Sequence, residues 1–275
     1  IVSISSEQEL VETFGKPDVN NFEYFFSAAN FLQYSNTLRV VRANQTSQVN
    51  ASTSGTGVLV KNTEDWTNNY ASGGQAGNAT FVAREAGAYG NTLLVATCPN
   101  AAAFEEEGAT TVNDASTAVG DTTIVTTAGT AFSVGDVIAF STSAGANDYD
   151  DGEQYRITAI NTHTLTIVQH PRGSGGLKRV ITNGANIRRR WRYYDAVDGA
   201  PGTSTWTSTR SGANDEIHIV VVDEDGSISG VPGQILETYN KVSKASDAKT
   251  PQGDDNYYPN VIYTKSKYIW WTKHH

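Results

Sequence analysis

The sequence predicts a multidomain α+β protein. Both ends of the chain would form a core of helices on a mixed sheet, and the middle would form an inserted, small antiparallel β-barrel-like domain. Three observations predict this class. Residues 6–32 have helical periodicity, residues 109–172 contain short strands separated by turns, and residues 215–223 form an apolar strand. The length of 275 residues is enough for two or three domains with cores of ordinary size.

These patterns divide the chain into four segments. Residues 1–52 form the first part of the core domain, with two helices and a strand. Residues 53–108 are a β-containing intermediate segment, and residues 109–172 are the inserted domain. Residues 173–275 return to the α+β core. A module whose termini lie close together is readily inserted into a loop of a host domain.

The composition restricts the class of function. Hydrophobic residues make up 38% and charged residues 18% of the chain, which favours a loop-rich, strand-rich globular protein. The net charge of −9 disfavours a dedicated nucleic-acid binder. No apolar run approaches the roughly 18 residues of a membrane helix, so we expect no membrane insertion. The single cysteine, Cys98, excludes an internal disulfide and a cysteine-only metal site.

The first helix is predicted to start at Ser6. Ser6 and Glu9 form a capping box, in which the hydroxyl accepts from an early helix N–H and the carboxylate reaches back. Gly15 and Pro17 end the helix. The apolar face consists of Leu10, Val11 and Phe14.

A second helix is predicted from Asn20 or Asn21, followed by a strand over residues 37–42. At this spacing an ordinary core is more probable than an aromatic cofactor site, so we expect the apolar face to be buried against a sheet. That face consists of Phe22, Phe25, Phe26, Ala29 and Leu32.

The segment that follows is interpreted as loops and short strands. Residues 44–57 are polar and predict a linker or surface loop, whereas residues 58–60 and 93–95 have strand-type apolar runs. The glycine-rich residues 72–77 lack the spacing of a phosphate-binding loop, so a plain loop is expected there.

The predicted β-barrel-like domain consists of four strands at residues 122–125, 137–140, 155–160 and 164–168. An acidic turn lies inside it. Its carboxylates suggest calcium, but their spacing does not match a calcium loop, so a solvated turn is the favoured interpretation. These acidic residues are Asp148, Asp150, Asp151 and Glu153.

The strongest predicted strand runs over residues 215–223 and is apolar enough to be central, with residues 235–239 as its partner. His218 lies beside Asp215 and Glu216, which suggests acid–base chemistry. However, neighbouring strand residues point to opposite faces, and no nucleophile or zinc motif accompanies them. A satisfied polar position near a sheet edge is the favoured interpretation. We therefore predict no enzyme activity, catalytic residue, cofactor or metal.

The densest basic and aromatic run is a candidate interface. It consists of Arg188, Arg189, Arg190, Trp191 and Arg192. Interleaved arginine and aromatic residues can bind single-stranded nucleic acid. In an acidic chain, an intersubunit patch is a simpler interpretation, as is a strand with arginines on both faces. Together with the acidic turns, the run could join repeated subunits through opposite charges.

The order of several segments resembles the tail sheath proteins of T-even-like contractile bacteriophages. These segments cover roughly the first 45 and the last 65 residues, and the middle matches only as a variable outward insertion. They are residues 9–17, 24–34, 38–43, 215–218, 222–226, 236–237, 242–249, 256–258 and 266–271.

This resemblance implies a structural subunit that polymerises around a tail tube and contracts to drive the tube through the host envelope. Its implied partners are copies of itself in a helical sheath, the tail tube protein, and the baseplate and tail terminator proteins, with no direct contact to nucleic acid. The implied location is the tail of the virion, after assembly in the cytoplasm of the host bacterium. The change between two lattices of one subunit would be a switch between two packings.

The chain also differs from the family pattern. It begins at Ile1 without the usual N-terminal arm and ends shortly after Trp271, so we expect an excerpt of a longer protein that is monomeric by itself. Two alternatives stay open. The first is the sheath of a phage-tail-like contractile injection system. The second is a receptor- or carbohydrate-binding tail protein, which would bind saccharides at the predicted β-barrel-like domain.

Overall fold

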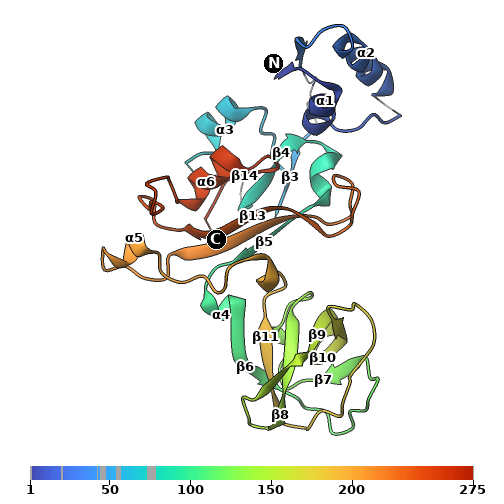
Figure 1. The fold of residues 1–275 in the computed structure, drawn as a ribbon, viewed down its shortest axis with the longest axis vertical. Helices are drawn as coiled ribbons and strands as arrows, with labels where there is room; N and C mark the ends of the chain where they lie inside the picture. Colours follow the sequence, from blue (N-terminus) through green and yellow to red (C-terminus); the bar gives the residue numbers. More distant parts are fainter. Residues whose placement is uncertain are drawn as a thin grey trace. The chain divides into compact units, whose positions relative to one another are not determined.

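The structure is a computed structural model that describes residues 2–19, 21–41, 43, 48–53, 57–72 and 79–274. Several expectations fall partly outside these residues: a helix start at Asn20, a strand reaching Arg42, the polar segment at 44–47 and 54–56, and the glycine-rich loop at 73–77. The described residues form α-helices and four sheets (Figure 1). The sheets are separate and antiparallel, so the expectation of one mixed sheet is wrong, whereas the α+β class is confirmed.

The chain divides into two compact units. The first consists of residues 1–95, 221–237 and 262–275, and the second consists of residues 96–220 and 238–261. The two ends of the chain therefore belong largely to the first unit, whereas the middle belongs to the second.

The described residues between 2 and 41 form a small lobe within the first unit. Helix α1 (Glu7–Phe14) begins as predicted, because the Ser6 side chain accepts from the Glu9 N–H. The Glu9 carboxylate reaches back to the N–H of Ser5, one residue earlier than a standard capping box. Gly15 ends the helix with φ +84°.

Helix α2 (Phe22–Leu32) and two short strands complete this lobe. Strand β1 (Val2–Ile4), which the sequence did not predict, pairs antiparallel with β2 (Leu38–Val40). The core contains Ile4, Leu10, Phe25 and Ala29. Phe22 and Phe26 remain 48% and 50% exposed, so the expectation that they are buried is wrong. Their positions lie beside the buried stripe, where a sheet of only two strands does not reach them.

The rest of the first unit contains a three-stranded sheet in the order β14–β4–β3. Its strands are β3 (Asn50–Ser52), β4 (Phe81–Ala86) and β14 (Ile269–Trp271), so an early segment pairs with the last strand. Strand β3 lies inside the segment predicted as a loop. Residues 58–60 form no strand; Val58 makes only an isolated bridge to Asn50. Helix α3 (Thr63–Asn69) was not predicted either.

A second three-stranded sheet has the order β13–β12–β5. Strand β12 (Glu216–Asp223) is central and β13 (Gln234–Ser243) is its neighbour, as predicted from the apolar run. Strand β5 (Leu93–Cys98) follows the 3-10 helix at Ala88–Thr92 and confirms the strand expected there. The unit boundary falls within these strands and within helix α6 (Tyr258–Lys265).

The second unit contains a six-stranded antiparallel sheet in the order β6–β11–β8–β9–β10–β7 (Figure 1). All four strands predicted in the middle of the chain are present. The sheet also includes β6 before them, which the sequence did not predict, and β11 after them, which agrees with the strand interpretation of the arginine run. The strands are β6 (Glu105–Thr111), β7 (Thr123–Val125), β8 (Val137–Ala144), β9 (Tyr149–Asn161), β10 (Thr164–His170) and β11 (Ala185–Arg190).

The expectation of a barrel is not confirmed. Beyond the ends of the two outer strands, an isolated bridge joins Val112 to Thr126, and it is flanked by backbone hydrogen bonds from the Asn113 N–H to Val125 and from the Thr127 N–H to Thr111. Local alternation predicts individual strands, but closure depends on hydrogen bonds between the first and last strands, which alternation does not encode. The core of this sheet includes Phe140, Tyr155 and Leu165. Short helices α4 (Ala101–Phe104) and α5 (Thr205–Ser208) and 3-10 turns at Gly129–Ala131 and Tyr194–Ala196 complete the unit.

No helix of the described residues combines the length and the apolar character that crossing a membrane requires.

Candidate functional site

Strand β11 places three arginines of the predicted interface between two other strands. Arg189 lies opposite Ile138 of β8 and Glu106 of β6, and Arg190 lies opposite Glu105. Because side chains alternate along a strand, Arg188 and Arg190 share one face of the sheet and Arg189 takes the other. The arrangement is therefore a strand with arginines on both faces, one of the two interpretations left open by the sequence.

Arg188 and Arg190 converge on the same two acids. The Arg188 Nε lies 3.4 Å from Glu105 Oε1, and its Nη2 contacts Asp151 Oδ1. The Arg190 Nε lies 3.2 Å from Glu105 Oε2, and its Nη1 lies 3.6 Å from Asp151 Oδ1. Arg188 is only 7% exposed, so this network is largely withdrawn from water on the arginine side.

Aromatic rings cover both guanidinium groups. The Arg188 guanidinium carbon lies 4.9 Å from the centre of the Tyr149 ring, and that of Arg190 lies 5.4 Å from the Tyr194 ring. At these distances the ring faces attract the cations. Burial lowers the pKa of Arg188, the neighbouring Arg190 lowers it further, and Glu105 raises it. Arginine starts from so high a pKa that Arg188 stays charged and holds its acids as a cation.

Arg189 is held on the other face of the sheet. Its Nη2 donates to the carbonyl oxygen of Ala102 at 2.7 Å and lies 3.2 Å from Glu106 Oε2. Its Nη1 lies 3.9 Å from Asp136 Oδ2. Burial raises the pKa of Asp136, whereas the Ser133 N–H and Arg189 lower it. Arg189 thus joins the end of α4 to the sheet and partly compensates a buried acid.

The last two residues of the run continue beyond β11. Trp191 is buried, and its backbone N–H donates to the Phe104 carbonyl oxygen at 2.7 Å. Its ring stacks on His218, with 6.4 Å between the ring centres. The Arg192 guanidinium lies 5.2 Å from the Tyr193 ring. A Cβ on Gly135 would come within 2.4 Å of Arg192 Cδ, so Gly135 leaves room for this side chain.

The arrangement binds charges of its own chain and contains no acid–base pair poised for chemistry. The sequence predicted the arginines but not Glu105, Glu106 or Asp136 as their partners. The only signal available in the sequence was their acidity. The bulge between Ile187 and Arg189 shifts the register of β11 against β6, and this register determines which acid lies opposite each arginine. The intersubunit role of the run stays a prediction.

The acidic turn of the second unit is also engaged within the chain. Asp148 accepts from Thr142 and Asp150 accepts from the Gly152 N–H, while Asp151 pairs with Arg188 and Glu153 with Arg179. Each carboxylate has a local partner.

His218 is a satisfied core residue. Its Nδ1 accepts from the Lys241 N–H at 3.0 Å, and its Nε2 lies 2.9 Å from the Gly199 carbonyl oxygen, to which it donates. Burial lowers its pKa, so the ring is neutral near pH 7. The sequence was wrong only in expecting a sheet edge, since β12 is central and His218 has no exposed surface.

Asp215 belongs to a separate network. Its Oδ1 accepts from the Ser204 N–H and its Oδ2 from the Ser204 hydroxyl, both at 2.8 Å, and the Ser243 hydroxyl also contacts Oδ2. Burial raises its pKa, but these hydrogen bonds outweigh burial and lower it. The carboxylate ties α5 to β13 and is not available as a base for a ligand.

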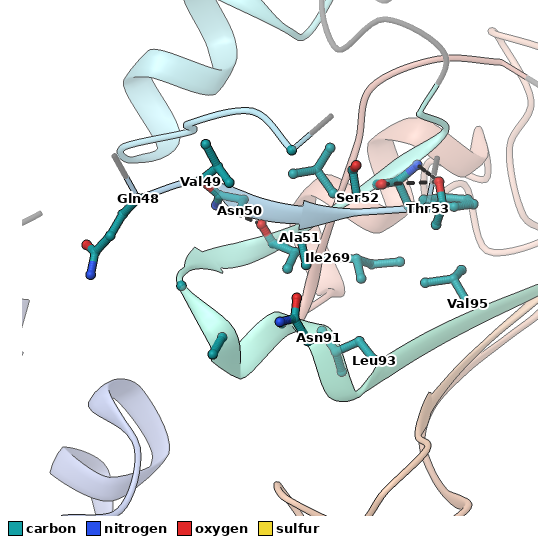
Figure 2. A pocket seen from close by; sticks show the side chains of 17 residues that line it. Gln48, Val49, Asn50, Ala51, Ser52, Thr53, Asn91, Leu93, Val95 and Ile269 are labelled. Atoms are coloured by element: carbon teal, nitrogen blue, oxygen red, sulfur yellow. Dashed lines mark hydrogen bonds between the residues drawn. The ribbon is translucent and has the colours of Figure 1, made fainter. Parts of the chain in front are cut away.

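The first unit contains a cavity of about 680 Å³ beside β3 (Figure 2). Figure 2 shows Ala51, Leu93, Val95 and Ile269 around it, together with the amide of Asn91. No described residue of the lining is an acid, a base, a tyrosine or a cysteine, so these residues supply no general acid or base.

Comparison with known proteins gives one partial similarity. No family model matches the sequence. The chain is 56% identical over 43 residues to the tail sheath protein of Enterobacteria phage T4. This match covers 16% of the chain and 6% of the length of the phage T4 protein. Part of the chain is therefore similar to part of a phage tail sheath protein.

Proposed function

We propose that the chain is part of a structural subunit of the contractile tail sheath of a bacteriophage. The observation that supports this most is the 56% identity over 43 residues to the tail sheath protein of phage T4. In this proposal, copies of the subunit polymerise around the tail tube, and contraction of the sheath drives the tube through the host cell envelope. The subunit acts in the virion tail after assembly in the host cytoplasm.

The described residues are consistent with a protein that assembles rather than catalyses. Both ring nitrogens of His218 and both carboxylate oxygens of Asp215 form hydrogen bonds within the core. The cavity of the first unit has no titratable lining residue among those described. A helical sheath needs head-to-tail contacts that do not close into a ring, and such contacts depend on surface shape and charge.

The proposed partners are further copies of the subunit, the tail tube protein, and the baseplate and tail terminator proteins. The sheath of a phage-tail-like contractile injection system would use the same mechanics. Capsid and portal genes beside the coding gene would favour a phage, and their absence from a complete gene cluster would favour the injection system.

Negative-stain electron microscopy of the full-length protein that contains the chain, expressed by itself, tests the proposal. We expect long tubes of regular diameter from the full-length protein. The 275-residue chain, imaged at the same concentration, is expected to stay monomeric. A discrete small oligomer of the full-length protein would contradict the sheath role and would direct attention to a glycan-binding screen.

The role of the arginine run requires a variant that does not break the fold. Arg188 is buried in its ion-pair network, so reversal of its charge would be expected to unfold the protein. A loss of tubes could then not be assigned to a lost contact between subunits. Arg192 forms no ion pair with a described acid and is the better probe. We expect R192E to reduce tube formation, and thermal melts of the 275-residue chain show whether the variant keeps its fold, because the Arg192 Nε is buried. Unchanged tube formation by R192E would contradict an intersubunit role for this residue.

A further inference from the structure

The second unit contains a cavity of about 650 Å³ between the α5 region, strand β13 and the loop at residues 249–256. We propose that this cavity binds carboxylate groups from the acidic surface of a second copy of the chain, through the ammonium groups of Lys241 and Lys249. The inference deepens the proposed function and rests on it, because it names one contact between neighbouring sheath subunits.

Among the described residues, neither of the two lysines that line the cavity takes part in an ion pair. The ion pairs described above are formed by Arg179, Arg188, Arg189 and Arg190, and none of those pairs includes Lys241 or Lys249. The one acid of the lining is Glu216, whose Oε2 accepts from the Gly202 N–H at 2.9 Å. The cavity therefore holds more positive than negative charge, although the chain as a whole is acidic.

Further hydrogen-bond donors accompany the lysines. The indole N–H of Trp206, a lining residue, is buried and has no acceptor among the described residues. The Arg210 guanidinium stacks on the Trp206 ring at 3.4 Å from its centre and adds a third positive charge beside the cavity. A buried donor without an acceptor costs about 1–3 kcal/mol, so an incoming acceptor has a free-energy advantage at this position.

The backbone holds Lys241 at the cavity in an unusual conformation. Lys241 has φ +51° within strand β13, a left-handed conformation that costs a non-glycine residue on the order of 1–2 kcal/mol. Its N–H donates to Nδ1 of the buried His218 at 3.0 Å, which fixes the main chain at this point. Residues kept in such conformations cluster at binding sites, where the strain positions a side chain.

The charge of the chain identifies the occupant. This part of the subunit has 29 acidic and 20 basic residues and a net charge of −9, so its copies in a lattice repel one another unless basic sites accept acidic groups. A basic cavity at one place and acidic groups elsewhere on the surface give a head-to-tail contact, which propagates instead of closing. Charge complementarity of this kind also fixes the register between neighbours.

Zero-length cross-linking tests the contact directly. Tubes are assembled from equal amounts of ¹⁴N- and ¹⁵N-labelled full-length protein and treated with a carbodiimide, which joins a lysine to an adjacent carboxylate. We expect mixed-isotope cross-links that join Lys241 or Lys249 to an aspartate or glutamate. Tubes that give mixed-isotope cross-links elsewhere and none at these lysines would overturn the inference.

Charge reversal gives an independent measure. We expect the full-length K241E/K249E protein to form at least tenfold less tube, by sedimentation, than the matched variant K16E/K61E, which changes the net charge equally at exposed lysines outside the cavity. Circular dichroism melts of both variants in the 275-residue chain check folding. Equal tube yields for the two variants would overturn the contact but leave the proposed function intact. Failure of the wild-type protein to form tubes would overturn both.

Discussion

Trp66 donates its indole N–H to the backbone carbonyl oxygen of Trp271 at 2.9 Å, although 205 positions separate the two residues. The Trp66 ring also stacks on Tyr263 and Trp270, with 4.7 Å and 5.4 Å between ring centres. An early helix and the last strand are thereby joined within the first unit. The prediction that the two ends of the chain build a common core depends on contacts of this kind.

Removal of this one hydrogen bond should destabilise the first unit. We expect W66F, which keeps an aromatic ring but lacks the N–H, to lower the free energy of unfolding by about 1–3 kcal/mol, because the buried Trp271 carbonyl loses its donor. Urea unfolding followed by far-ultraviolet circular dichroism measures the change. The control W206F removes an indole N–H that has no described acceptor. If W206F were as destabilising as W66F, the loss would come from ring packing and not from the hydrogen bond.

Asn50 is expected to be among the most sensitive polar residues of the chain. It is fully buried; its Nδ2 donates to the carbonyl oxygen of Ala83 at 2.8 Å, and its Oδ1 accepts from the Val60 N–H at 2.9 Å. N50A leaves these groups unpaired, so we expect a loss of about 2–4 kcal/mol. N68A, at an exposed helical position, should change stability by less than about 0.5 kcal/mol. Chemical denaturation of the two variants side by side tests this difference.

Asp223 should give the chain a distinct sensitivity to acid. Burial raises the pKa of Asp223, but hydrogen bonds from the Ser229 N–H and the Thr92 hydroxyl outweigh burial and lower the pKa to about 2. The unfolded-state pKa of aspartate is about 3.9. A lowered pKa in the folded state stabilises the protein above pH 4, and this contribution disappears as the pH falls through about 2.

The comparison of wild type with D223N isolates this contribution. We expect D223N to be about 2 kcal/mol less stable at pH 6, and the difference to shrink between pH 4 and pH 2. Urea titrations at several pH values provide the measurement. A stability difference that is independent of pH would show that Asp223 stabilises through neutral hydrogen bonds only.

Two neighbouring aromatic residues of α2 should respond very differently to truncation. Phe25 is buried in the core of the lobe, whereas Phe26 is half-exposed, and the rings meet edge to face at 5.6 Å. We expect F25A to cost about 3–5 kcal/mol and F26A less than about 1 kcal/mol in the 275-residue chain. Thermal melts decide between this arrangement and a buried Phe26. Equal losses would mean that both rings are buried in solution.

The ion pairs of β11 predict a further asymmetry. R188A should cost about 3 kcal/mol, because it removes the more buried of the two arginines that pair with Glu105. D151N should cost less than about 1 kcal/mol, since the Asp151 side chain is 60% exposed and water replaces its partner. Denaturation of both variants at low and at high salt tests the difference, and only the effect of D151N should vanish in high salt.

Local sequence patterns predicted the elements that depend on neighbours along the chain. The capping residue Ser6 and the terminating Gly15 set the first helix, because their hydrogen bonds and backbone angles involve residues only a few positions away. The alternation of apolar residues located β8, β9 and β10, and the apolar run at 216–223 correctly predicted a central strand.

The pairing of strands and of charged side chains depends on the folded arrangement of distant residues. Strand β3 forms from polar residues because the Asn50 side chain donates a hydrogen bond to a main-chain carbonyl oxygen of β4. No local sequence pattern predicts this contact. The same limit applies to the sites. The sequence located the arginines, but strand register gave them acids of their own chain, and the left-handed backbone at Lys241 placed an unpaired lysine in a cavity. Hydrogen bonds and ion pairs between distant residues depend on the packed arrangement, and periodicity carries no information about that arrangement.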